Sequence, residues 1–260
     1  MIPFIKASAC GNDFLIIDGA HAPGVLAEVT RRICDRHNGV GADGVEWLFP
    51  AEDADVEARL INADGSEAEI SGNGTRCVAA YLASEGGKSS VAIRTGAGVK
   101  KCELISHAGN LFEFETAMGT PEAGSEMALA GVTGMDVSMG NPHYVIFVDA
   151  FPANWREMGA EIGRHPHFPQ GVNIEFVKVM GRNDLEARFF ERGAGETQSS
   201  GTGSCASAVA AIASGLAASP VKVHAAGGTQ TVRWSQDDDQ VFLRGPARII
   251  CRGEFFEGKA

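Results

Sequence analysis

Two short glycine-rich segments carry residue types suited to chemistry at a carboxylate, namely Ser71-Gly72-Asn73-Gly74 and Ser200-Gly201-Thr202-Gly203. Each precedes an alanine-rich stretch that is predicted to be helical. Its backbone amides therefore lie at a helix N-terminus, where unpaired N–H groups and the helix dipole bind anions. If both segments converge on one carboxylate, Ser71 and Ser200 flank its α-carbon from opposite sides. Two opposed groups suit inversion of configuration at carbon.

Inversion at an α-carbon requires one group that removes a proton and another that delivers one. Cysteine thiols suit this task, because their unperturbed pKa is about 8.5 and a helix terminus can hold one of them as thiolate. A serine hydroxyl that ionises roughly 5 pH units higher adds about 7 kcal/mol to the proton transfer. Ser71 and Ser200 therefore suit the task only if a neighbouring group activates them.

The chain contains an internal repeat whose offset is close to half its length. Gly11-Asn12 matches Gly140-Asn141, and the two serine-glycine segments match each other at the same offset. The similar segments 91–98 and 221–228 follow at almost the same offset. The repeat predicts two tandem domains of one fold, related by a pseudo-twofold axis, with a ligand where they meet. The segment from Gly119 to Gly134, rich in Gly, Ala, Pro and Glu, is predicted to connect the halves.

Hydrophobic periodicity places the main elements. Leu26 to Arg36 and Trp155 to Arg164 are predicted to form amphipathic helices, and Cys77 to Glu85 and Cys205 to Leu216 form central alanine-rich helices. Apolar runs at 14–17 and 144–148 indicate strands. We expect an α+β fold in which each half has a mixed or antiparallel sheet curled around a central helix. The predicted domains are residues 1–118, together with 249–260, and residues 119–248.

Composition excludes several classes of function. The 260 residues include 22 Lys and Arg against 33 Asp and Glu, a net charge of −11, which disfavours nucleic acids and anionic membranes as partners. A small anionic or zwitterionic ligand remains compatible with a locally positive pocket. The six cysteines form no CxxC pair, and no targeting or membrane-spanning segment is recognisable. We therefore expect reduced thiols and a cytoplasmic location.

Other site motifs are incomplete. Neither glycine-rich segment completes the GxGxxG pattern of dinucleotide binding, because Cys77 and Ala206 occupy the last positions. A serine hydrolase is disfavoured because the chain contains no G-x-S-x-G sequence. His165 and His167 occur without an HExxH motif or an accompanying cysteine pair, so no metal site is predicted.

Nine segments, spread over almost the whole chain, resemble the diaminopimelate epimerases, a family of two-cysteine, cofactor-independent amino-acid racemases and epimerases. The similar segments are GNDF at 11–14, GVGAD at 39–43, NADGSEAE at 62–69, GNGTRC at 72–77, MGNPH at 139–143, FPQGVNIEFV at 168–177, ERGAGETQ at 191–198, GTGSC at 201–205 and GPA at 245–247. The resemblance implies interconversion of the LL and meso isomers of 2,6-diaminopimelate, in the route to lysine and the bacterial cell wall. It implies no cofactor, an amino-acid substrate and a homodimer.

The resemblance also implies roles for individual residues. Four residues at the helix termini would hold the reacting carboxylate: Gly72, Asn73, Gly201 and Thr202. Six residues would line the pocket and bind the remote amino and carboxyl groups: Asn12, Asn62, Asn141, Asn173, Glu191 and Arg192. The residue chemistry agrees, because Arg192 can pair with a carboxylate in a forked geometry and Glu191 with an ammonium group.

The chain departs from the family pattern at the two acid/base positions. The family has cysteine there, and this chain has Ser71 and Ser200. Three hypotheses remain open for these serines. The chain is an engineered Cys-to-Ser double variant, a natural binding paralogue without efficient racemisation, or an epimerase or dehydratase acting on another amino acid with an activated serine.

Overall fold

The chain forms two compact units in the computed structural model, which describes residues 1–22 and 24–256. Unit 1 comprises Met1–Thr116 with Gly245–Ala260, and unit 2 comprises Ala117–Arg244. The predicted boundaries, 118/119 and 248/249, lie slightly later in the chain. The strands β8 (Leu111–Gly119) and β17 (Val241–Phe255) both continue across the observed boundaries, so no break in composition marks them.

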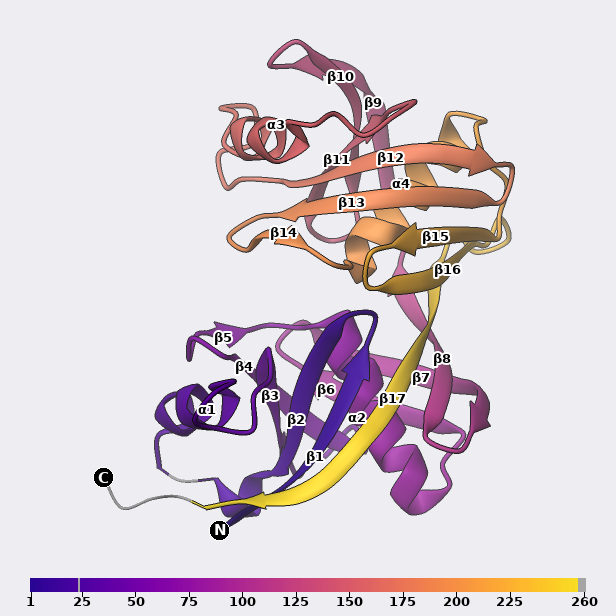
Figure 1. Cartoon of the computed structure of the whole chain (residues 1–260). Helices are drawn as coiled ribbons and strands as arrows, with labels where there is room; N and C mark the ends of the chain where they lie inside the picture. The colour runs from indigo at the N-terminus through magenta and orange to yellow at the C-terminus, as the bar shows by residue number, and fades with distance from the viewer. Residues whose placement is uncertain (23, 257–260) are drawn as a thin grey trace. The chain divides into compact units, whose positions relative to one another are not determined.

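Unit 1 is a mixed sheet wrapped around one helix (Figure 1). Hydrogen-bonded neighbours follow the order β17, β1, β2, β3, β4, β6, β7, β8, and β8 pairs again with β17, so the sheet closes on itself. The pairs β2–β3 and β4–β6 are parallel, and the short β5 extends β4. Besides β8 and β17, the strands of unit 1 are β1 (Ile2–Ala9), β2 (Asn12–Asp18), β3 (Gly44–Phe49), β4 (Val56–Asn62), β5 (Glu67–Ala68), β6 (Ser90–Thr95) and β7 (Gly98–Ala108).

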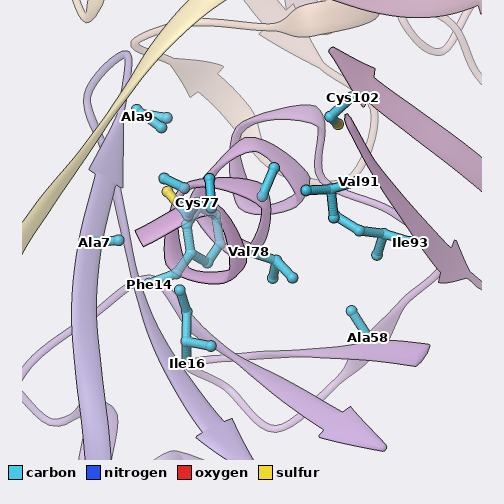
Figure 2. Packing of buried hydrophobic residues seen from close by; sticks show 14 of the residues in the cluster. Ala7, Ala9, Phe14, Ile16, Ala58, Cys77, Val78, Val91, Ile93 and Cys102 are labelled. Carbon is cyan, nitrogen blue, oxygen red and sulfur yellow. The ribbon is translucent and has the colours of Figure 1, made fainter. Parts of the chain in front are cut away.

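The central helix of unit 1 is α2 (Gly72–Gly86), which packs against β1, β2, β6 and β7. Its small side chains let the strands approach closely, and Gly87 ends it in the left-handed conformation (φ 62°) that glycine adopts without strain. Figure 2 shows Phe14, Val91 and Ile93 directed toward α2 in this core.

A second apolar layer covers the other face of the sheet in unit 1. Helix α1 (Leu26–Cys34) packs against β3 and β4 over the fully buried Trp47, whose Nε1 donates a hydrogen bond to Thr30 Oγ1 at 3.0 Å. A short 3-10 helix, η1 (Gly19–His21), precedes α1. Strand β3 is therefore covered on both faces, which explains its nearly continuous apolar sequence.

Unit 2 repeats this arrangement. Its sheet follows the order β9, β10, β11, β12, β13, β15, β16 and the first residues of β17, with the pairs β11–β12 and β13–β15 parallel. Helix α4 (Gly201–Ala213) packs inside this curled sheet, and α3 (Trp155–Ile162) packs on its outer face. The strands are β9 (Glu122–Leu129), β10 (Val132–Ser138), β11 (Pro142–Phe147), β12 (Asn173–Gly181), β13 (Asp184–Glu191), β14 (Gly195–Thr197), β15 (Val221–Ala225) and β16 (Gly228–Trp234).

The internal repeat holds at the level of strand register. Phe14 pairs with Gly44 between β2 and β3, and His143 pairs with Asn173 between β11 and β12. His143 follows Phe14, and Asn173 follows Gly44, at the same offset that relates Ser200 to Ser71. The expected α+β fold, with a curled sheet around a central helix in each half, is confirmed.

The segment from Gly119 to Gly134 is not the connector that its composition predicts. It contains β9 and the start of β10, which pair antiparallel within unit 2. Most side chains of β9 are exposed, so its polar composition reflects a solvated strand rather than a linker. Helices α2 and α4 also begin several residues before the predicted starts, at the glycines that follow Ser71 and Ser200.

Among residues 1–22 and 24–256, no helix combines the length and the apolar composition needed to cross a membrane.

Candidate active site

Ser71 caps the N-terminus of α2. Its backbone is extended (φ −124°, ψ 121°), and its Oγ accepts the N–H of Gly74 at 3.1 Å. The first-turn amides of Gly72 and Asn73 point from the helix terminus along the positive end of the dipole. Because no acidic residue occupies the first turn, this terminus keeps its preference for an anion.

A chain of side-chain hydrogen bonds fixes Asn73 beside Ser71. Its amide nitrogen donates to Asn12 Oδ1 at 2.7 Å, and Asn12 in turn donates to Asp43 Oδ2 at 3.1 Å. The Arg76 guanidinium donates to Asn73 Oδ1 from the next turn of the helix. The predicted site residues Asn12, Gly72 and Asn73 therefore lie together with Ser71 in unit 1. Asn62 ends β4, and its amide donates to Ser66 Oγ at 3.0 Å.

Ser200 caps α4 in the same way. Its backbone is extended (φ −135°, ψ 131°), its Oγ accepts the N–H of Gly203 at 3.2 Å, and it is buried. The amides of Gly201 and Thr202 begin the helix. Asn141 donates to Thr202 Oγ1 at 3.4 Å, which is the counterpart of the contact between Asn12 and Asn73 in unit 1.

The Ser200 side chain lies beside the Glu191 carboxylate. Burial raises the pKa of Glu191, and the side chains of Ser200, His143 and Thr197 partly oppose that rise. A carboxylate with a raised pKa is a stronger base at neutral pH. Ser200 therefore has a partner that can take its hydroxyl proton, in addition to the ammonium-binding role that the resemblance implies for Glu191.

Asn173 and Arg192 lie together at the adjoining ends of β12 and β13. Asn173 Oδ1 accepts the backbone N–H of Arg192 at 3.0 Å, and its amide nitrogen donates to the carbonyl of Pro142 at 3.0 Å. One guanidinium nitrogen of Arg192 donates to the carbonyl of Gln170 at 3.1 Å. The side chain is thus anchored at one donor and presents its remaining donors outward.

A pocket of about 310 Å³ adjoins Arg192 within unit 2. Arg164 contributes a second cation to its wall, and Glu191 contributes a carboxylate. The lining also includes the glycine-rich turns at Gly171 and Gly193 and the apolar side chains of Ala160, Val172 and Phe190. This mixture of charges suits a zwitterionic group.

His143 and Glu175 form a buried pair behind Ser200. His143 Nδ1 lies 2.7 Å from Glu175 Oε1, and His143 Nε2 lies 3.0 Å from Asn141 Oδ1. Both side chains are fully buried, and burial raises the pKa of Glu175 although His143 counteracts this. The pair orients Asn141, which contacts the N-terminus of α4.

Two glutamates were missed by sequence reasoning, Glu46 on β3 and Glu175 on β12. Both are buried on the faces that pack against the central helices. Two signals were available, a charged residue inside an apolar strand and the occurrence of both glutamates at matching positions of the repeat. The described part of the chain holds no group of three or more His, Cys, Asp or Glu side chains arranged to bind a metal ion.

Comparison with solved structures supports the fold. A phenazine biosynthesis protein of the PhzF family from Bacillus anthracis has a TM-score of 0.74 at 17% identity, with 97% of this chain and 98% of that chain covered. A hydroxyproline epimerase from Agrobacterium vitis has a TM-score of 0.68 at 16% identity, with 97% and 90% covered. At these identities the likeness extends to the architecture alone.

Comparison of sequences identifies the family as well as the fold. The diaminopimelate epimerase from Moorella thermoacetica is 39% identical, with 97% of this chain and 98% of that protein aligned. The diaminopimelate epimerase from Microcystis aeruginosa is 38% identical over the same shares. A family model described as diaminopimelate epimerase matches residues 4–123 and 135–250, and so includes both capping serines and both helix termini. By these matches over both repeats, the chain belongs to the diaminopimelate epimerase family.

Proposed function

We propose that this chain is a cofactor-independent epimerase that interconverts LL- and meso-2,6-diaminopimelate by two-base proton transfer at the α-carbon. The observation that carries the proposal is the duplicated N-terminal cap, in which Ser71 and Ser200 each begin a helix whose first turn has no acidic residue. Membership of the family supplies the substrate class. Ser71 and Ser200 are assigned as the two acid/base groups.

We assign carboxylate binding to the amides at each helix terminus, Gly72 and Asn73 on α2 and Gly201 and Thr202 on α4. Removal of the α-proton spreads negative charge onto the carboxylate oxygens. Preorganised N–H groups and helix dipoles stabilise that charge more in the transition state than in the bound substrate. Thus the same termini that bind the substrate also make its α-proton easier to remove.

The remote end of the substrate carries an ammonium and a carboxylate group. Arg192 supplies a planar guanidinium that matches a carboxylate in two parallel hydrogen bonds, and its backbone is anchored by Asn173. Glu191 carries the complementary negative charge for the ammonium group. Asn12, Asn62 and Asn141 supply neutral donors and acceptors that complete the recognition.

Proton transfer by a serine requires a partner for its hydroxyl proton. At Ser200 we assign this role to the neighbouring Glu191 carboxylate, which takes the hydroxyl proton while Ser200 Oγ removes the α-proton. In the opposite direction the proton returns to Ser200 as Ser200 protonates the carbanion. This relay lowers the penalty of about 7 kcal/mol that an unassisted hydroxyl carries relative to a thiol.

The test follows the α-proton signal of diaminopimelate in heavy water by NMR, with the parent chain and with Ser71→Cys/Ser200→Cys. We expect slow exchange by the parent and an increase of up to about 10⁵-fold in the double variant, the factor that corresponds to roughly 5 pH units of acidity. Absence of exchange in both proteins would refute the proposal. Calorimetric titration with a panel of amino acids would then identify a binding paralogue, the alternative that the paired serines favour.

A cytoplasmic location is part of this proposal. None of the six cysteines forms a disulfide, and five of them are buried. Cysteines that stay in the thiol form are typical of a reducing compartment.

A further inference from the structure

A buried carboxyl group lies beneath each capping serine. A Cβ placed on Gly74 would lie 2.0 Å from Glu46 Oε1 and 3.3 Å from Ser71 Cβ. A Cβ placed on Gly203 would lie 2.8 Å from Glu175 Oε1 and 2.9 Å from Ser200 Cβ. In both units the glutamate and the serine border the same small space, which only glycine leaves open.

The two glutamates differ in their partners. Glu175 pairs with His143, whereas Phe14 occupies the equivalent position in unit 1. Glu46 is 3% exposed, and burial raises the pKa of its carboxyl to about 8. Burying a carboxyl without an opposite charge is costly, so its position beneath a capping serine requires an explanation.

The described neighbours of Glu46 on the sheet are apolar, and the Ser71 loop borders the same small space at Gly74. Across the sheet it faces Ile16 on β2 and Leu60 on β4. On α2 the titratable neighbour is the buried Cys77 thiol, whose pKa is raised chiefly by burial and further by Glu46.

The other charged groups near this end of α2 are engaged elsewhere. Arg76 directs its guanidinium to Asn73 and to the carbonyl of Pro246. On β2, Asp13 is paired with Lys6 and with Arg36. Glu46 is therefore the carboxyl group that borders the Ser71 loop from within the core.

The internal repeat supplies no equivalent of Glu191 for Ser71. The Glu191 carboxylate lies beside Ser200, whereas Asn62 occupies the matching position of the repeat in unit 1. An asparagine amide cannot accept a proton at any ordinary pH. Among the described residues of unit 1, Glu46 is the buried carboxyl next to the Ser71 loop.

We propose that Glu46 is a positioning residue for Ser71, whose hydroxyl proton it accepts while Ser71 Oγ removes the α-proton of the substrate. The inference rests on the proposed function. The Cα–H bond breaks and leaves its electron pair on carbon, and a new Oγ–H bond forms. The original Oγ–H bond breaks and its proton passes to the Glu46 carboxylate. In the reverse direction the carboxylic acid returns the proton as Ser71 protonates the carbanion.

The first experiment measures the coupling between the two positions without relying on turnover. The full chain with Ser71→Cys is alkylated with iodoacetamide over a range of pH, and modification at position 71 is quantified by peptide mass spectrometry. A neighbouring carboxylate disfavours a thiolate, so adding Glu46→Gln should lower the alkylation midpoint by about one pH unit, a tenfold change in thiolate population. Identical midpoints with and without Glu46→Gln would overturn the proposal.

The second experiment measures diaminopimelate exchange in heavy water against pH. We expect exchange by the parent chain to rise as pH passes through about 8, the region where Glu46 ionises. Glu46→Gln should remove this rise and reduce exchange by about 10²-fold, with little change in KM. Glu46→Leu, which matches the apolar surroundings and should fold readily, is expected to give the same loss.

Glu28→Gln, at an exposed position on α1, is the matched control and should leave the profile unchanged. Exchange by the parent that is unaffected by Glu46→Gln would refute the role of Glu46 alone. Absence of exchange in the parent and in the Ser71→Cys/Ser200→Cys variant would refute the proposed function, and with it the relay, whatever the alkylation result.

Discussion

Replacing Glu46 by leucine is expected to make unit 1 much less sensitive to alkali. Burial raises the pKa of the Glu46 carboxyl from 4.5 to about 8, whereas in the unfolded chain the group titrates near its ordinary value. The folded state therefore binds this proton more tightly. The resulting stabilisation is complete below about pH 4.5 and is lost as pH rises through about 8. At 1.36 kcal/mol per pH unit, the loss amounts to about 5 kcal/mol, of which about 4 kcal/mol falls between pH 5 and pH 9.

Urea unfolding at pH 5 and pH 9, followed by tryptophan fluorescence, measures this loss. Trp47 lies on β3 next to Glu46, and the other two tryptophans, Trp155 and Trp234, belong to unit 2. Trp155→Phe/Trp234→Phe therefore leaves Trp47 to report the unfolding of unit 1. In this background we expect the parent to lose about 4 kcal/mol more than Glu46→Leu between the two pH values.

Glu28→Gln, at an exposed position, provides the control and should follow the parent. The reasoning would be refuted if the difference in unfolding free energy between the parent and Glu46→Leu stayed constant, within about 1 kcal/mol, from pH 5 to pH 9. Such a result would mean that Glu46 ionises at an ordinary pH in the folded chain and is therefore solvated or partnered.

Three further changes test other parts of the site. Gly74→Ala normally stabilises a helix by about 0.5–1 kcal/mol, but here the new Cβ meets Glu46 Oε1, so we expect a loss of about 1–3 kcal/mol that Glu46→Ala largely relieves in urea unfolding. His143→Phe leaves Glu175 buried without its partner and should destabilise unit 2 by about 3–5 kcal/mol in calorimetry, whereas His143→Phe/Glu175→Leu should recover most of this. Arg192→Lys removes a forked donor and should raise KM for diaminopimelate about tenfold in steady-state kinetics, with a smaller change in kcat.

Much of the fold could be predicted from the sequence because the repeat constrains it. The matched segments Gly11-Asn12 and Gly140-Asn141 do lie at the starts of equivalent strands, and the two serine-glycine segments do begin equivalent helices. Serine followed by glycine before an alanine-rich run is a local signal, since a capping side chain and the helix it begins are adjacent in the chain. Local sequence patterns of this kind therefore predict the local structure well.

Features that depend on distant pairing could not be predicted. The polar segment 119–134 forms strand β9 and part of β10 because its neighbours supply hydrogen bonds, although its own composition favours a linker. The buried position of Glu46 is likewise hidden, because one charged residue in a strand normally faces solvent. The pairing of His143 with Glu175 joins residues 32 positions apart and depends on the parallel register of β11 and β12.

Strand β17 has a consequence for how the protein is made. Its segment from Gly245 onward belongs to unit 1 and pairs with β1, yet the whole of unit 2 separates it in sequence from the rest of unit 1. A nascent polypeptide emerging from the ribosome therefore exposes the edge of β1 until this late segment has been synthesised. Completion of the first half is thus postponed until after translation of the second, so an N-terminal fragment expressed alone presents an open, adhesive border to other chains.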